Sequence, residues 1–311
     1  MADKIATREA YGDALVELKD KYDYVVLDAD LAEATKTIKF KKACPERFFD
    51  CGIAEGNMIS VAAGLAAAGK MAFASSFAMF AAGRAFEQVR NSVGYPHLNV
   101  KIGATHAGIT VGEDGATHQC LEDIALMRTI PGMTIVNPAD AVEARAAVEA
   151  SMQTYGPFYM RFGRYACPVV TEGHKFELGK GVKMRDGKDV TIVANGFMVH
   201  LAVEAAELLA AEGISAEVIN IHTVKPLDAE IIAESAKKTG AVVTAEEHSV
   251  IGGLGAAVCE ALCESVPTPV LRVGVEDKFG KSGTVPALLE EYGLTAANIV
   301  KKAKAAIALK K

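Results

Sequence analysis

Hydrophobic and polar positions alternate between two patterns along the chain. Short apolar runs rich in β-branched residues are followed by longer, alanine-rich stretches with apolar residues at helical spacing. This alternation is typical of βαβ units, whose strands form a largely parallel sheet. In the first part of the chain, the pattern predicts strands over 24–30, 99–105, 133–138 and 158–163, and helices over 7–20, 56–69, 79–93, 120–128 and 139–153.

The pattern is interrupted over residues 165–188. This stretch gathers glycine, proline and charged residues and loses helical periodicity, so we interpret it as a connector. Beyond it the alternation restarts, with strands predicted over 189–196, 215–221, 241–247 and 269–275, and helices over 198–212, 228–238, 254–265 and 295–309. The sequence therefore predicts two α/β domains with largely parallel sheets, residues 1–170 and the smaller 189–311, joined by a linker over 171–188.

Composition and charge narrow the class of protein. The 311 residues carry 39 acidic and 33 basic side chains, a net charge of −6, and no long run of one sign. Such a chain lacks the electrostatic footprint of a nucleic-acid-binding protein. The N-terminus is charged from the third residue, and no long uncharged apolar run follows, so we expect no membrane segment and a cytoplasmic protein. The six cysteines form no CxxC pair, which argues against a zinc site.

Loops that follow strands are the places to look for a site, because ligands of open α/β sheets bind beyond the carboxyl ends of the strands. Several such loops in the first domain carry polar or glycine residues, and those of the second domain do not. The loops are 28–37, 51–58, 74–80, 105–119 and 161–164.

The stretch VGEDGATHQ, residues 111–119, is the densest of these. Asp114 lies between glycines, where the backbone can turn sharply and leave a carboxylate free to accept hydrogen bonds from a hydroxylated substrate. An ordinary solvated turn is the alternative. His106 and His118 flank the loop and could bind an anion or move a proton near neutral pH. Neither lies in an HExxH pattern that would predict a metal site.

Three further residues have both a structural and a functional interpretation. Glu55 opens a helix, where it either complements the helix dipole or serves as a buried carboxylate facing a heteroaromatic base. Phe77 and Phe80 are three residues apart and form either core packing or a stacking surface for a planar ring.

Arginines near predicted strands and helices are candidates for binding a phosphate. A guanidinium matches a phosphate in shape and charge, and surface ion pairing is the alternative for each arginine. The candidates are Arg8, Arg161 and Arg164. The stretch 244–258 comes close to a dinucleotide fingerprint, but Val258 occupies its third small position, so tight strand-to-helix packing explains it better.

Taken in this order, these stretches resemble the C-terminal half of transketolase, over essentially the entire chain. GEDGATHQ is the most specific match, although the family has proline where Ala116 stands here. The resemblance implies a thiamine-diphosphate pyrimidine-binding fold followed by a smaller transketolase C-terminal domain. It also implies a transferase that moves a two-carbon ketol unit from a ketose phosphate to an aldose phosphate, in pentose phosphate interconversion.

The resemblance also implies roles for individual residues. Glu55 would bind the aminopyrimidine ring of thiamine diphosphate, and Phe77 and Phe80 would stack on it. Glu55, His106 and His118 would be catalytic. The remaining implied contacts are Asp30 on the cofactor and substrate channel, Arg8, His106 and Arg161 at the substrate phosphate, and Asp114 and His118 at the sugar hydroxyls. Ala34 stands where the family has a phosphate-contacting serine, and Thr35 is the candidate replacement.

One expected motif of a thiamine diphosphate enzyme is missing. Such enzymes hold the diphosphate through a divalent cation bound by a GDG stretch and a downstream asparagine, and this chain has no GDG. We therefore expect no metal ligands in this chain. A separate N-terminal subunit would bring the diphosphate site and its Mg²⁺ or Ca²⁺, in an α₂β₂ heterotetramer acting on sugar phosphates.

Three alternatives stay open. The β subunit of a 2-oxo acid dehydrogenase shares the two-domain layout, and a split deoxyxylulose phosphate synthase shares parts of the GEDGATHQ loop. Both would turn over pyruvate. The third alternative is a non-catalytic scaffold or regulatory subunit that kept the fold.

Overall fold

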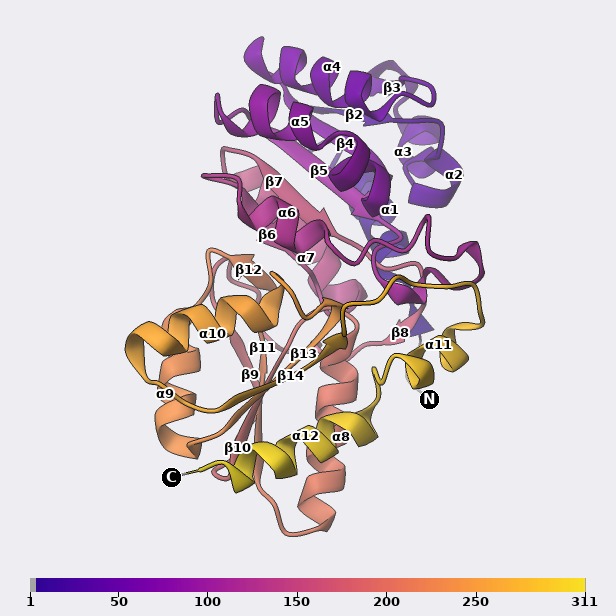
Figure 1. Cartoon of the computed structure of the whole chain (residues 1–311). Helices are drawn as coiled ribbons and strands as arrows, with labels where there is room; N and C mark the ends of the chain where they lie inside the picture. Colours follow the sequence, from indigo (N-terminus) through magenta and orange to yellow (C-terminus); the bar gives the residue numbers. More distant parts are fainter. Residues whose placement is uncertain (1–3, 311) are drawn as a thin grey trace.

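The chain forms two main sheets, each covered by helices on both faces (Figure 1). The structure is a computed structural model and describes residues 4–310. The first unit contains, in chain order, β1 (Lys4–Ile5), α1 (Thr7–Glu17), β2 (Tyr24–Asp28), α2 (Ala32–Thr35), α3 (Ile38–Ala43), η1 (Pro45–Arg47), β3 (Phe48–Asp50), α4 (Glu55–Ala67), β4 (Met71–Phe77), η2 (Met79–Arg84), α5 (Phe86–Gln88), η3 (Val89–Gly94), β5 (Val100–Thr105), η4 (Ile109–Asp114), α6 (Asp123–Arg128), β6 (Thr134–Val136), α7 (Ala141–Gln153) and β7 (Phe158–Arg161).

The second unit follows a short strand, β8 (Cys167–Pro168), that pairs back with β1. Its elements are β9 (Val182–Arg185), β10 (Val190–Ala194), α8 (Met198–Ala211), β11 (Ala216–Asn220), β12 (Thr223–Lys225), α9 (Ala229–Thr239), β13 (Val242–Ser249), α10 (Leu254–Ser265), β14 (Val270–Val275), α11 (Val285–Glu291) and α12 (Ala296–Ala308). Helices α8 and α12 cover one face of the sheet, and α9 and α10 cover the other.

The order of strands explains why the polar loops of the first unit meet. Its sheet runs β12-β6-β7-β5-β4-β2-β3 over the residues described, and every pair except β12–β6 is parallel. Parallel strands bring their carboxyl ends to one edge. The loops after β2, β3, β4, β5 and β7 therefore open at the same edge, as the sequence predicts.

The second sheet runs β14-β13-β10-β11-β9, with β9 as an antiparallel edge strand. The predicted α/β class with largely parallel sheets is thus confirmed. β12 leaves this unit and pairs antiparallel with β6, so a segment from the second half of the chain completes the first sheet. Lys225 at its end donates hydrogen bonds to the carbonyls of Arg128 and Ile130, which ties the two units together.

Several elements differ from those that the pattern predicts. β4, β9, β12 and α11 were not expected, and the helix expected over 79–93 is irregular, with π-helical turns η2 and η3 on either side of α5. β4 escapes the pattern because it contains no β-branched residue and mixes small residues and serines with its two phenylalanines. β9 lies inside the predicted linker 171–188, where an exposed edge strand needs no apolar run.

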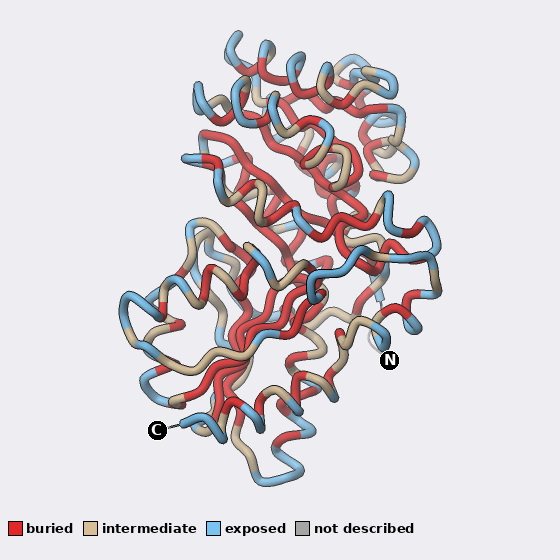
Figure 2. The backbone as a smooth tube through the Cα atoms, in the orientation of Figure 1, coloured by how far each residue is buried: buried red, intermediate tan, exposed pale blue. Residues whose placement is uncertain are grey.

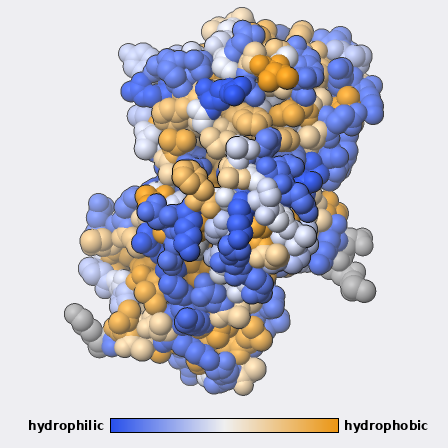
Figure 3. Space-filling view, turned by 45° about the vertical axis from the view of Figure 1, so that its right-hand side comes forward, coloured by the Kyte–Doolittle hydropathy of each residue, from blue (hydrophilic) through white to orange (hydrophobic). Residues whose placement is uncertain are grey.

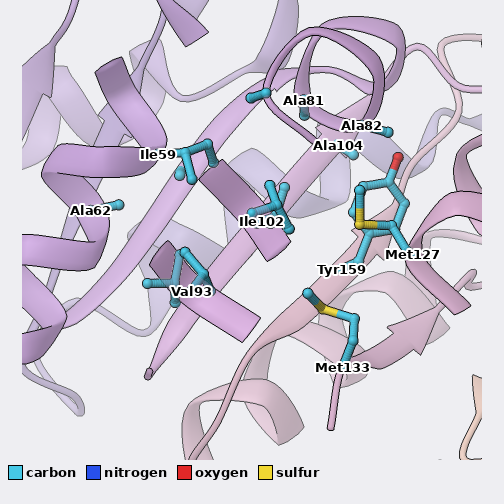
Figure 4. Packing of buried hydrophobic residues seen from close by; sticks show 14 of the residues in the cluster. Ile59, Ala62, Ala81, Ala82, Val93, Ile102, Ala104, Met127, Met133 and Tyr159 are labelled. Carbon is cyan, nitrogen blue, oxygen red and sulfur yellow. The ribbon is translucent and has the colours of Figure 1, made fainter. Parts of the chain in front are cut away.

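The strands carry the burial of both units, as Figure 2 shows. In the first unit, the helices pack small side chains against the sheet. Ala81, Ala82 and Ala104 belong to the same buried cluster as Ile102 and Val93, with Ile102 drawn between the alanines and Val93 in Figure 4. Such small residues let the backbone of η2 approach β4 and β5, so the loop that carries Phe80 is held close to the strand ends.

The surface adds little to this picture. On the face shown in Figure 3, hydrophilic residues are mixed with smaller apolar areas, and a waist separates the two units. Between residues 4 and 310, no helix has the length and apolarity needed to cross a bilayer. Within the same range, no group of three or more His, Cys, Asp or Glu side chains is arranged to hold a metal ion.

Candidate functional site

A buried carboxylate lies at the first turn of α4. Glu55 is 2% exposed and begins the helix after Ala54, which provides no side-chain cap. The positive end of the helix dipole favours a carboxylate there. Yet Glu55 Oε2 has no hydrogen-bond partner among the described residues, and its nearest cation, Arg84 Nη1, is 3.7 Å away on a side chain that is 62% exposed. A buried acceptor without a partner is costly, so this oxygen is suited to a donor that comes from outside the chain.

Aromatic rings form a wall at the same edge of the sheet as Glu55. Phe77 ends β4, and Phe80 lies in the π-helical turn η2. Their rings stack with centroids 5.8 Å apart and an angle of 17° between the planes. The ring of His106 stacks on Phe77 at 3.8 Å, and His118 meets Phe80 edge-on at 5.3 Å. The structure thus brings together two pairs of residues that the sequence proposed separately.

His106 joins this wall to an arginine. Arg8 Nη1 donates to the carbonyl of Ala34 at 2.9 Å and contacts His106 Nε2 at 3.1 Å. Because a guanidinium can only donate, Nε2 must be the unprotonated ring nitrogen, and the Nδ1 proton is donated to Thr105 Oγ1 at 2.9 Å. Burial, with Arg8 as the next cause, lowers the pKa of His106 to about 3. The imidazole is therefore neutral at physiological pH and oriented by its neighbours.

His106 also has an unusual backbone. Its φ of 56° lies in the left-handed region, which non-glycine residues rarely adopt. Asp30 shares this feature, with a φ of 61°. Both residues follow a strand of the same sheet edge, β5 and β2 respectively. Strained backbone of this kind is concentrated at functional sites.

The two arginines at the end of β7 have different environments. Arg161 is 3% exposed, and its Nε lies 2.8 Å from Asp123 Oδ2, while its Nη2 donates to the carbonyls of Glu247 and Cys120. The ion pair uses Nε, whereas Nη1 makes no hydrogen bond among the described residues. The structure thus anchors Arg161 in the interior through two of its three nitrogens, and its contact with a substrate phosphate stays a prediction.

Arg164, three residues later, is in a better position. Its side chain is 35% exposed, and its Nη1 donates to the carbonyl of Val111 and lies 3.4 Å from Glu113 Oε2. Burial lowers the pKa of Arg8 and of His106, and the positive charge of Arg164 adds to the lowering in both. Arg164 therefore belongs to the same cationic group as Arg8.

The loop after β2 is tied down by Asp28. This carboxylate accepts hydrogen bonds from Thr35 Oγ1 at 2.7 Å, Thr37 Oγ1 at 2.8 Å and the amide of Leu31 at 2.7 Å. Burial raises the pKa of Asp28 to about 6. Because Thr35 is fully buried and bonded to Asp28, its hydroxyl is not free to replace the serine expected at Ala34.

The remaining predicted residues lie on exposed parts of the same edge. Asp30 is exposed, and its amide is held by Asp50 Oδ1 at 3.1 Å. Asp114 is exposed at the end of η4, and His118 is partly buried, with its Nδ1 2.9 Å from Thr117 Oγ1.

Gln119 shapes the loop from within, a role that the sequence did not suggest. Its Nε2 lies within hydrogen-bond distance of three carbonyls, those of Ile109 and Gly112 at 3.3 Å and Lys281 at 3.0 Å. Gly112 and Gly115 have φ angles of 83° and 78°, so only glycine fits these turns without strain. Asp114 is therefore carried by a loop of fixed shape.

Comparison with known proteins places this arrangement in a class. The transketolase pyrimidine-binding domain matches residues 3–169, and the transketolase C-terminal domain matches residues 179–299. The chain therefore belongs to the transketolase family, and membership implies dependence on thiamine diphosphate.

Relatives of similar length define the particular kind of chain. A 6-deoxy-6-sulfo-D-fructose transketolase subunit of Clostridium sp. (strain MSTE9) is 50% identical over 95% of this chain and 92% of its own length. An apulose-4-phosphate transketolase subunit of Phocaeicola vulgatus is 41% identical over 96% of each chain. A solved split-gene transketolase, described as an inactive β4 tetramer, is 55% identical, with a TM-score of 0.91 over 99% of this chain and 100% of its own. This chain is a C-terminal subunit of the split transketolase type, which implies an N-terminal partner subunit.

Proposed function

We propose that this subunit, together with its N-terminal partner, transfers a two-carbon ketol unit from a ketose phosphate to an aldose phosphate. The observation that carries the proposal is the buried Oε2 of Glu55, which lacks a hydrogen-bond partner within residues 4–310, at the edge where the aromatic wall and the cationic group meet. A scaffold that had lost catalysis would have no need to keep a buried carboxylate in this state.

The residues of this edge fit the pyrimidine ring of thiamine diphosphate. Glu55 would hold a proton at a ring nitrogen, and the stacked Phe77 and Phe80 would cover the face of the ring. When bound, the cofactor supplies a carbon nucleophile and an electron sink for carbonyl chemistry. The chain's own contribution is to orient the ring and to exclude water from the carboxylate.

A partner subunit would supply what this chain lacks. The sequence has no GDG stretch, and residues 4–310 contain no cluster of metal-ligand type. We infer that the diphosphate and its Mg²⁺ or Ca²⁺ are bound by the N-terminal subunit, and that the active site forms between subunits of an α₂β₂ heterotetramer.

The substrate would lie across the cationic group and the GEDGATHQ loop. Arg8 and Arg164 would bind the terminal anion, and the neutral His106 would orient the guanidinium of Arg8 through Nε2. Asp114 and His118 would accept or donate hydrogen bonds to the sugar hydroxyls, and Asp30 would border the channel. Arg164 is our first choice for this contact because Arg161 uses Nε and Nη2 in the interior, and Arg161 stays a second candidate through Nη1.

The nature of the sugar is a finer question. The Clostridium relative is named for a sulfonated sugar and the Phocaeicola relative for a phosphorylated one. A sulfonate and a phosphate are both tetrahedral anions that two arginines can bind. The pair Arg8 and Arg164 is therefore compatible with either, and a pentose or hexose phosphate is our first choice of donor.

A substrate comparison tests the proposal. The chain, co-expressed with its N-terminal partner, is supplied with thiamine diphosphate and Mg²⁺ and then with either a ketose phosphate and an aldose phosphate, or pyruvate and an aldose phosphate. We expect ketol transfer in the first case and no release of carbon dioxide in the second. Turnover of pyruvate would favour the 2-oxo acid dehydrogenase or deoxyxylulose phosphate synthase alternatives, and no turnover of either would favour the scaffold.

A further inference from the structure

Two adjacent glutamates on β13 of the second unit are buried, and they make contacts in different directions. Glu246 is 0% exposed and Glu247 is 3% exposed. Successive side chains of a strand point to opposite faces of the sheet. Glu246 accepts hydrogen bonds from the amides of Leu254 at 2.6 Å and Gly255 at 2.8 Å, at the start of α10 in its own unit.

Glu247 instead reaches into the first unit. Its Oε1 accepts the amide of Thr110 at 2.6 Å, in the first turn of η4. The approach requires Gly108, which has a φ of 83° and whose α-carbon faces the carboxylate so closely that a Cβ there would collide with it. A carboxylate of the second unit therefore fixes the start of the segment that ends at Asp114.

Other parts of the second unit hold the rest of the loop. The segment between β14 and α11 runs alongside it in Figure 1, and the carbonyl of Lys281 accepts a hydrogen bond from Gln119 at 3.0 Å. Gly280 lies so close to Gln119 that a Cβ would collide with its side chain. The amide of Ser249 donates to the carbonyl of Leu121 at 2.8 Å, just beyond the loop.

From these contacts we propose that Glu247 is a positioning residue for substrate binding, through which the C-terminal domain sets the shape of the loop that carries Asp114 and His118. The part that concerns substrate rests on the proposed function, whereas the contact itself does not. A hydrogen bond from an amide to a buried carboxylate is stronger than one between neutral groups, so its loss should loosen the loop.

Glu246 provides a matched control, because it is a buried carboxylate on the same strand that also accepts backbone amides opposite a glycine, Gly253.

The first measurement is hydrogen–deuterium exchange by mass spectrometry on the co-expressed complex without substrate. We expect Glu247→Ala to speed exchange over residues 108–119 by about tenfold or more. A tenfold change corresponds to about 1.4 kcal/mol, roughly the stabilisation lost with one hydrogen bond to a charged group. Glu246→Ala should act at the start of α10 and leave 108–119 unchanged. Equal exchange over 108–119 in Glu247→Ala and in the unchanged protein would overturn the proposal.

The second measurement separates positioning from general stability. In Glu247→Ala, the KM of the donor should rise by about tenfold while kcat changes less than about twofold. Asp114→Ala should raise the donor KM much less in the Glu247→Ala background than in the unchanged protein. Glu247→Gln keeps an acceptor for Thr110, so it should restore most of the donor affinity and covers the case in which the alanine variant fails to fold. Fully additive effects, or an equal rise of KM in Glu246→Ala, would contradict the proposal. If the unchanged complex transfers no ketol unit while the exchange differs as expected, the proposed function fails and the positioning contact stands.

Discussion

Two regions of the molecule bury glutamates, and they treat the carboxylates in opposite ways. At the start of α4, Glu55 is buried, yet one of its oxygens has no partner among residues 4–310. At the junction of the two units, Glu246 and Glu247 are equally buried, and each accepts backbone hydrogen bonds. Burial alone therefore does not identify a functional carboxylate. What sets Glu55 apart is that no hydrogen bond within residues 4–310 reaches its buried Oε2, at the start of a helix and beside the aromatic wall, whereas Glu246 and Glu247 accept backbone amides.

Removing the charge of Glu55 should give the largest functional effect. Glu55→Gln should lower kcat by about 100-fold or more, since a neutral amide cannot hold a proton for the cofactor ring. The free energy of unfolding should stay within about 0.5 kcal/mol of the original value, because no hydrogen bond within the chain is lost. Steady-state kinetics of the reconstituted enzyme and urea unfolding of the chain measure the two quantities.

The same substitution at Glu246, at the junction of the two units, should lower stability and leave turnover nearly unchanged. Glu246→Gln weakens two hydrogen bonds to a charged group and should lower the free energy of unfolding by about 1–3 kcal/mol, with kcat nearly unchanged. If Glu55→Gln proved the more destabilising of the two, or if Glu246→Gln abolished turnover, the contrast between the regions would be wrong.

The two arginines after β7 extend the comparison. Arg164→Gln should raise the KM of the donor by about tenfold or more with little effect on stability, because a partly exposed guanidinium loses its anion. Arg161→Gln should leave the carboxylate of Asp123 buried without its partner and destabilise the chain by about 3–5 kcal/mol. Measuring both variants by kinetics and by unfolding would show whether Arg161, against this account, binds the phosphate.

A smaller effect is expected at the tip of the loop. Asp114 is exposed, so Asp114→Ala should leave the fold intact and raise the KM of the donor by several-fold, about 1 kcal/mol of binding, through lost contacts with sugar hydroxyls. Glu207 of α8 in the second unit is also an exposed carboxylate and provides the control variant, Glu207→Ala, whose donor KM should change less. An unchanged donor KM in Asp114→Ala, with full turnover, would remove the sugar-binding role.

The last comparison concerns pH and a fourth buried glutamate. Glu143 of α7 accepts the amide of Ala139 at 2.6 Å and the side chain of Asn220 in the second unit at 2.8 Å, and burial raises its pKa to about 8 from 4.5. Between these values the folded chain keeps a proton that the unfolded chain has lost. This contribution to stability is therefore full below the unfolded pKa and is lost as pH rises through the folded pKa.

Glu143→Gln isolates that contribution, because glutamine does not titrate. From about pH 5 to about pH 9, the free energy of unfolding should fall more steeply in the unchanged chain, by at most about 1.4 kcal/mol per pH unit, than in the variant. Urea unfolding across this range measures the difference. Parallel pH profiles of the two chains would show that Glu143 keeps its ordinary pKa.

The sequence predicted the fold better than the site. The alternation of β-branched and alanine-rich runs indicated both largely parallel sheets. Parallel strands covered by helices on both faces need apolar residues at successive positions, and this pattern is local in the sequence. It could not predict β12, whose three residues join the sheet of the other unit and are specified by contacts far away in the sequence. It also missed β4, whose small side chains pack closely against η2.

For the site, residue types and spacing were enough to propose the aromatic pair Phe77 and Phe80, which do lie face to face. They were not enough to choose between Arg161 and Arg164. The choice depends on which guanidinium meets Asp123, a residue 38 positions earlier in the chain than Arg161. Glu247 and Gln119 escaped notice for the same reason, since Glu247 bonds to Thr110 and Gln119 to Lys281, each in the other unit.

The central claim is that Glu55 completes a cofactor site that this chain encloses only in part. Ketol transfer measured with thiamine diphosphate and Mg²⁺, for the chain alone and after addition of the N-terminal partner, tests it most directly. We predict no transfer by the chain alone, full transfer once the partner is added, and no recovery when Glu55→Gln replaces the original chain. Full transfer by the chain alone would contradict the account.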